Sequence, residues 1–129
     1  MIQMLYSEDG TVWSEPKDVY VPLTSRSMAG APGIAELPDG RIVVSFQTDE
    51  NSSEKGVSHC VMKTVVSDGT PCKDLQRKNF SEADNVFGTP TGECSVWTGI
   101  CYANGRLYAA GGTSAGAEMK YIAFPEWEE

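Results

Sequence analysis

The chain has 129 residues, of which 40% are hydrophobic and 22% are charged, and its formal net charge is −8. This composition is typical of one globular domain and excludes a disordered chain. The acidic balance argues against a nucleic-acid-binding protein, because phosphate backbones are bound through clusters of Lys and Arg. The nearest thing to a basic cluster is Lys73, Arg77 and Lys78, which has Asp74 among its members and is expected to be a solvated loop.

Membrane insertion and metal binding are not expected either. No apolar run approaches the roughly 18 residues that span a bilayer, and no signal peptide is visible. The spacing of Cys60, Cys72, Cys94 and Cys101 fits no zinc pattern, and His59 is the single histidine. We therefore expect no metal and no cofactor. Cys60 and Cys101 lie in strand-like apolar runs and are expected to be buried thiols, although a disulfide stays open and cysteine usage leaves the compartment undecided.

The first predicted element is a hairpin centred on Asp9-Gly10. A strand-like run ends at Tyr6, and Trp13 stands as an aromatic anchor where the next strand begins. An Asp-Gly pair between two strands is a strong hairpin signal, because a type I′ turn needs positive φ at both central residues.

The following elements form an internal repeat. Residues 33–46 read as a strand, an Asp39-Gly40 turn and a second strand, and residues 99–111 repeat this order around Asn104-Gly105. Between them, Ser67-Asp68-Gly69-Thr70 echoes the first hairpin without an aromatic anchor after it. A last strand is predicted over 119–124, and no segment has the period of a helix.

Repeated short antiparallel strands predict an all-β fold built from the four-stranded blades of a β-propeller. A β-sandwich is the alternative, since it also uses short strands and tight turns. We expect the end of one blade in residues 1–24, one blade in 25–90 and most of the next in 91–129.

These segments amount to about two blades, whereas closed propellers have roughly four to eight. Two blades alone would expose apolar faces and unpaired strand edges. The chain is therefore expected to be a fragment of a ring, with six blades as the expected number. A homo-oligomer in which several copies assemble the ring is the alternative.

Several motifs resemble the sialidase superfamily. Ser7-Glu8-Asp9-Gly10-Thr11-Val12-Trp13 resembles the Asp-box, one residue short before its aromatic position. In that motif the Ser and Asp side chains hold the backbone amides of the turn, and the Trp packs beneath the hairpin. Residues 30–41 and 93–106 resemble the first-strand motifs of its blades, and the chain is most similar to BNR-repeat and exo-arabinanase-like members.

The resemblance implies an O-glycosyl hydrolase, secreted or periplasmic, that removes terminal sugars from a glycan or polysaccharide. Such cleavage needs two carboxyl groups across the scissile bond. Glu93 is the first catalytic candidate, because it lies at the start of the first strand of a blade. In such propellers this strand lines the central funnel. Asp49 and Glu50 are further candidates, because a loop at this place in a blade carries the family's acid/base residue. A solvated loop is the alternative for all three.

The substrate-binding candidates are Trp97, Tyr102 and Arg26. The two aromatic rings suit the apolar face of a sugar, and core packing is an equally good interpretation of both. In true sialidases three arginines bind the carboxylate of the substrate. The first arginine of this clamp would fall at Gly30, so sialic acid is not the expected substrate. Arg26 could replace that arginine only after a loop rearrangement. As an isolated segment the chain is expected to be inactive, and a non-catalytic carbohydrate-binding propeller assembled from several copies is the alternative function.

Overall fold

The computed structural model describes residues 1–23, 29–49, 61–85, 96–112 and 119–124. Every strand pair in these residues is antiparallel, and the described part of the chain contains no α-helix. The predicted all-β class is therefore confirmed.

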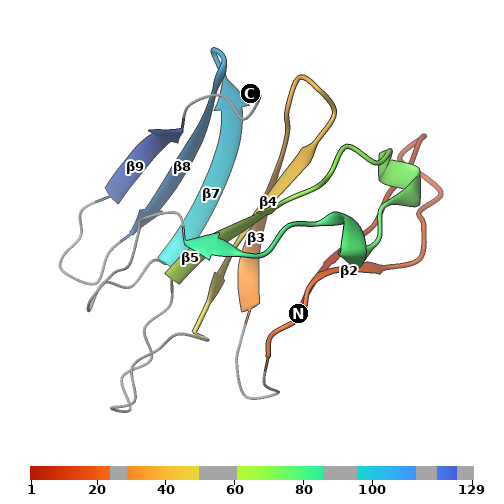
Figure 1. Cartoon of the computed structure of the whole chain (residues 1–129), viewed down its shortest axis with the longest axis horizontal. Helices are drawn as coiled ribbons and strands as arrows, with labels where there is room; N and C mark the ends of the chain where they lie inside the picture. Colours follow the sequence, from red (N-terminus) through yellow and green to blue (C-terminus); the bar gives the residue numbers. More distant parts are fainter. Residues whose placement is uncertain (24–28, 50–60, 86–95, 113–118, 125–129) are drawn as a thin grey trace.

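The strands form three sheets that follow one another in chain order (Figure 1). The N-terminal sheet consists of β1 (Ile2–Met4) and β2 (Lys17–Tyr20). The central sheet consists of β3 (Ala29–Glu36), β4 (Ile42–Thr48), β5 (Val61–Val66) and β6 (Asp84–Asn85). The C-terminal sheet consists of β7 (Val96–Ala103), β8 (Arg106–Gly112) and β9 (Met119–Phe124). Two 3-10 turns, η1 (Cys72–Asp74) and η2 (Arg77–Asn79), lie between β5 and β6.

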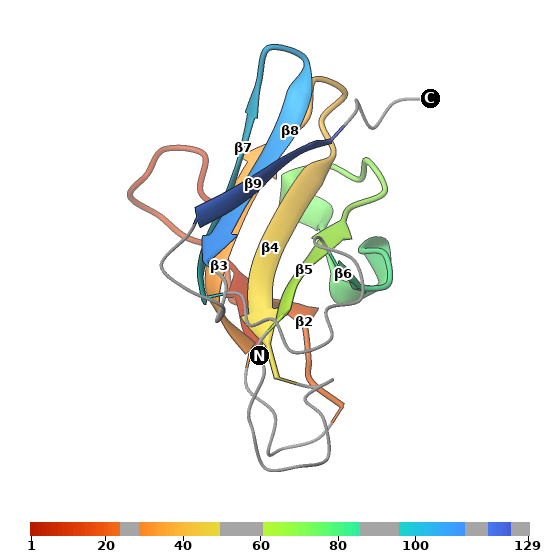
Figure 2. The same ribbon diagram turned by 90° about the vertical axis from the view of Figure 1, so that its left-hand side faces the viewer.

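The central sheet is covered on both faces. Ile42, Val44 and Phe46 of β4 belong to a core cluster that includes residues of the N-terminal sheet. Val43 points to the other face, where it packs in a cluster with Leu107 of the C-terminal sheet. Side chains of a strand alternate between faces, so a strand covered on both sides reads as a continuous apolar run. Figure 2 shows the C-terminal sheet lying across the central one.

β3 and β7 are the first strands of their sheets, and they lie next to each other. Gly33 permits this approach, because a Cβ atom there would lie 2.9 Å from Ser45 Oγ and 3.5 Å from the backbone nitrogen of Ile100. Both strands also carry an irregularity in register at corresponding places, between Gly30 and Gly33 in one and between Val96 and Gly99 in the other. The sequence repeat is thus also a repeat of backbone geometry.

The turns follow the predictions in one case out of three. Asn104 and Gly105 have φ of 52° and 75°, as a two-residue type I′ hairpin requires. The type I′ prediction is wrong at Asp9-Gly10 and at Asp39-Gly40, because only the glycine of each pair has positive φ. In the second case the Gly40 N–H donates to Leu37 O at 2.9 Å, and Pro38 restricts the first turn position to negative φ.

Two side chains expected to be buried are exposed. Trp13 is 56% exposed, so it does not pack beneath its hairpin. It lies in the connection between β1 and β2, which closes through its own backbone where the Ser14 N–H donates to Tyr6 O. Cys101 is exposed because it alternates with Ile100 and Tyr102, which pack toward the central sheet. Cys60 lies outside the described residues.

Candidate functional site

The ends of several strands meet along one edge of the central and C-terminal sheets. In the central sheet, Ala29 pairs with Thr48, which pairs with Val61. In the C-terminal sheet, Val96 pairs with Gly112, which pairs with Met119. We call these six positions together with Asp49 the loop rim.

The loop rim belongs to both sheets because β3 and β7 run in the same direction. The far end of β3, at Ala35 and the following Leu37, packs in one cluster with Ile100 and Tyr102 of β7. The starts of the two strands therefore lie at the same end of the structure (Figure 1).

Asp49 follows β4 directly and is half-buried at the loop rim. Three other candidates, Arg26, Glu50 and Glu93, lie outside the described residues. In chain order, Arg26 comes shortly before β3, Glu50 follows Asp49, and Glu93 comes shortly before β7. Each of these three segments is thus joined to a strand at the loop rim.

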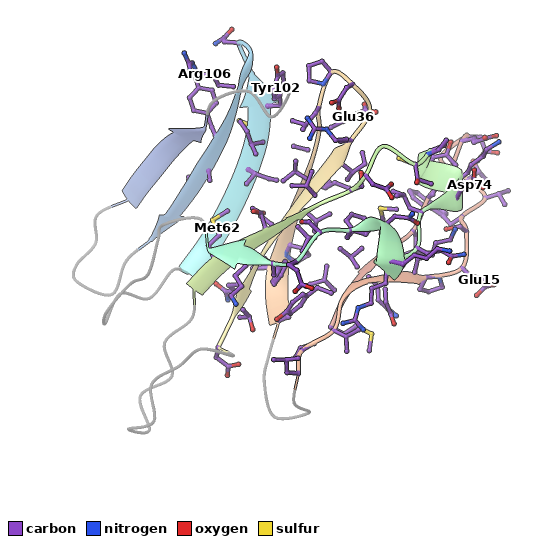
Figure 3. The ribbon with its side chains drawn as sticks, in the orientation of Figure 1. Glu15, Glu36, Met62, Asp74, Tyr102 and Arg106 are labelled. Atoms are coloured by element: carbon purple, nitrogen blue, oxygen red, sulfur yellow. The ribbon has the colours of Figure 1, made fainter. Side chains whose placement is uncertain are left out.

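The two aromatic candidates lie at opposite ends of β7. Trp97 is the second residue of that strand, next to the loop rim, and its side chain lies outside the described residues. Tyr102 lies near the Asn104-Gly105 turn, at the same end as Glu36 (Figure 3). It packs partly buried against the cluster of Leu37 and Leu107. The structure does not bring Tyr102 together with Asp49, and core packing accounts for its position.

The half of β4 that leads to the loop rim contains buried polar groups, which the sequence analysis did not identify. Ser45 Oγ and Gln47 Oε1 are buried and have no hydrogen-bond partner among the described residues. Thr48, the last residue of the strand, is fully buried. Buried polar groups are normally satisfied, so the unpartnered atoms of Ser45 and Gln47 call for an explanation. The sequence feature that indicates these polar groups is Ser45, which interrupts the apolar run of β4.

The first Asp-box-like segment has the local bonding expected from the resemblance. Ser7 Oγ accepts a hydrogen bond from the Gly10 N–H at 2.8 Å. Asp9 Oδ1 accepts from the N–H groups of Thr11 and Val12 at 2.8 and 2.9 Å. These bonds lower the pKa of the Asp9 carboxyl, and they give the connection between β1 and β2 a defined shape.

The second copy of this segment is more complete than the sequence indicated. The Ser14 Oγ accepts from the Tyr6 N–H at 2.9 Å, and Ser81 Oγ accepts from the Val66 N–H at the same distance. The two serine N–H groups donate back to the carbonyls of Tyr6 and Val66, both at 2.8 Å.

This equivalence corrects the prediction that the second copy lacks an aromatic anchor. Phe80 precedes Ser81 as Trp13 precedes Ser14, and unlike the exposed Trp13 it packs partly buried against the core cluster of β4. The insertion that contains η1 and η2 separates Phe80 from Asp68, which is why the pattern is hidden in the sequence.

The Asp68 carboxylate accepts three hydrogen bonds in this loop. Its oxygens accept from Thr70 Oγ1 at 2.6 Å, from Asn79 Nδ2 at 3.1 Å and from the Thr70 N–H at 3.0 Å. These hydrogen bonds favour the ionised form and lower the pKa of Asp68 to about 2.

Substituting Asp68→Asn should therefore lower stability in a pH-dependent way. A lowered carboxyl pKa in the folded state stabilises the protein above the normal value of 3.8, and this contribution is lost as the pH falls through about 2. Urea unfolding at pH 7 should show the variant less stable than the parent, with the difference vanishing near pH 2. Asp74→Asn, at an exposed position in η1, is the matched control and should show no such difference. A constant difference across this range would contradict the role given to the charge.

No protein-family model, no curated protein and no solved structure matches the chain. In the described residues, no helix is long and apolar enough to cross a membrane. The same residues contain no group of three or more His, Cys, Asp or Glu side chains that could hold a metal ion. The loop rim is the candidate site, because Asp49 lies there and because Arg26 and Glu93 shortly precede, in the sequence, the strands β3 and β7 that begin there.

Proposed function

We propose that the three sheets are successive blades of a β-propeller of the sialidase type. Three observations support this proposal. The central sheet has the strand order β3-β4-β5-β6, in which each strand pairs with the next, as in a propeller blade. The first strands β3 and β7 lie side by side, as innermost strands of adjacent blades do. Finally, the two Asp-box-like segments that end at Ser14 and Ser81, which we call the serine loops, connect β1 to β2 and β5 to β6. In this scheme these strands are the third and fourth strands of blades.

The function we propose is hydrolysis of a glycosidic bond at the loop rim, with carboxyl groups supplied by Asp49 or Glu50 and by Glu93. The observation that carries it is that β4 ends and β7 begins at the same rim, on two sheets in contact. Packed sheets lie about 10 Å apart. Paired carboxyl groups of glycosidases are separated by about 5 to 9.5 Å. Loops from these two strands can therefore supply carboxyl groups on both sides of one glycosidic bond.

A neutral terminal sugar fits this rim better than sialic acid. Gly30, where the clamp arginine would fall, contributes no side chain to bind a carboxylate, and it begins the irregular stretch of β3. The following residue, Ala31, has φ of 49°, so the backbone there has an unusual conformation next to the rim. Trp97 is the proposed stacking surface for the sugar ring.

The proposal is tested by Glu93→Gln in the assembled propeller rather than in the isolated segment, assayed with a panel of p-nitrophenyl glycosides that includes arabinofuranosides. Loss of a general acid or base lowers rate by a factor of about 100 to 10,000, so we expect kcat to fall at least 100-fold with little change in KM. Glu36→Gln makes the same chemical change at the end of β3 that lies away from the loop rim, and it should leave kcat unchanged (Figure 3). Unchanged turnover in Glu93→Gln would overturn the role of Glu93. Sugar binding by the parent without any turnover would favour a carbohydrate-binding propeller instead.

A further inference from the structure

A pocket that shares no described residue with the loop rim lies between the N-terminal sheet and the outer edge of the central sheet. Its volume is about 590 Å³, which is in the range of small-molecule sites. One wall is apolar and includes Tyr20 of β2 and Phe80, which follows η2. Three basic residues also line it: Lys63, Arg77 and Lys78. Two of them belong to the sequence cluster expected to be a solvated loop, and folding adds Lys63 from β5.

Lys63 is the distinctive member of this lining. It is only 8% exposed and pairs across the ladder with Phe46, whose ring lies 4.3 Å from that of Tyr20 between centroids. The described residues provide no hydrogen bond or ion pair to the ammonium of Lys63 or to the charged groups of Arg77 and Lys78. A buried ammonium without a counter-charge is unfavourable, and an anion in the pocket would compensate it.

The charges that line the pocket also favour an anion. Among the described residues of the lining, Glu82 is the acidic one, and it is exposed. The described part of the lining therefore has a positive balance in a chain whose net charge is −8. Oxyanions are bound by this combination, because lysine provides a compact point charge and arginine a planar pair of donors.

We propose that this pocket binds a small organic anion through its carboxylate, sulfate or phosphate group. Lys63 contacts the oxyanion at the base of the pocket, and Arg77 and Lys78 bind it from the exposed side. Tyr20 and Phe80 cover the apolar part of the same molecule. The site is separate from the loop rim, so it does not depend on glycosidase activity.

The test is binding of sulfate, phosphate and D-glucuronate by the full chain, measured by titration calorimetry and by the shift in Tm at matched ionic strength. Glucuronate separates a sugar-acid site from a simple oxyanion site, and glucose is the neutral control. We expect saturable binding of at least one anion, no binding of glucose, and at least a tenfold loss of affinity in Lys63→Met. Methionine keeps the apolar stem of lysine and removes the charge, so the Tm of the unliganded variant should not fall.

Lys73→Met is the matched control, because it removes one positive charge from the same loop at a residue outside the lining. It should bind the anion as the parent does, and so should Glu93→Gln. If Lys63→Met fails to fold, the double variant Arg77→Met with Lys78→Met changes only exposed positions and should show the same loss. Equal affinity in the pocket variants and in Lys73→Met, or no saturable binding by the parent, would overturn the proposal.

Discussion

Substituting Phe46→Ala is expected to lower the free energy of unfolding by about 3–5 kcal/mol. Phe46 is fully buried on the face of β4 that packs against the N-terminal sheet, in a cluster with Ile2 and Val19. Its ring also contacts Tyr20, with 30° between the ring planes. Removing the ring loses both its burial and this aromatic contact, and leaves a cavity between two sheets.

The loss should be concentrated at one interface. Hydrogen exchange should show reduced protection of the amides in β2, with those of β8 affected mainly through global unfolding. Ile34→Ala is the control, because Ile34 is 58% exposed in the neighbouring strand and such a surface change should alter stability by about 0.5 kcal/mol or less. Urea unfolding measures both variants. A similar small loss in both would mean that the N-terminal sheet contributes little to stability.

Substituting Gly33→Ala is expected to lower the free energy of unfolding by about 1–3 kcal/mol. The added methyl group would lie 2.9 Å from Ser45 Oγ, which belongs to a fully buried residue of β4. Contact at this distance forces the sheets or the serine to move. Because Gly33 lies where β3 approaches β7, the strain should act on the interface between the central and C-terminal sheets.

A double-mutant cycle separates this contact from any general effect of alanine. Ser45→Ala alone should be neutral or stabilising, since its hydroxyl is buried without a partner among the described residues. The double variant should recover part of the loss, with a coupling energy of about 0.5–3 kcal/mol. Gly99→Ala, at the corresponding position of β7, has no atom within 4 Å of the added carbon and should be nearly neutral. Purely additive effects at positions 33 and 45 would contradict the proposed contact.

The success of the sequence predictions depended on how local each feature is. The Asn104-Gly105 turn was predicted because two adjacent residues determine it. The Asp39-Gly40 turn was predicted with the wrong type, because Pro38 shifts the turn by one position. The aromatic anchor of the second serine loop was missed, because an insertion separates Phe80 from the motif to which it corresponds.

For the candidate site too, the sequence could nominate individual residues but could not predict how they are arranged in space. Residue types and motifs could nominate Asp49, Glu93 and Tyr102, but they carry no information about which strand ends meet. The structure places Asp49 at the loop rim and Tyr102 at the other end of β7. The basic pocket could not be predicted, because Lys63 is separated along the chain from Arg77 and Lys78 and joins them only across β5 and η2.

The sequence by itself determined the all-β class, the repeat of its hairpins and the hydrogen bonding of the Ser7 and Asp9 side chains, since these follow from residue alternation and neighbouring side chains. Only the tertiary structure decided that β4 is buried on both faces, that Trp13 and Cys101 are exposed, and that three basic side chains line one pocket. These features depend on which faces of distant strands come together. Which faces come together is decided by the apolar area buried over whole sheets, and a local sequence pattern does not specify that area.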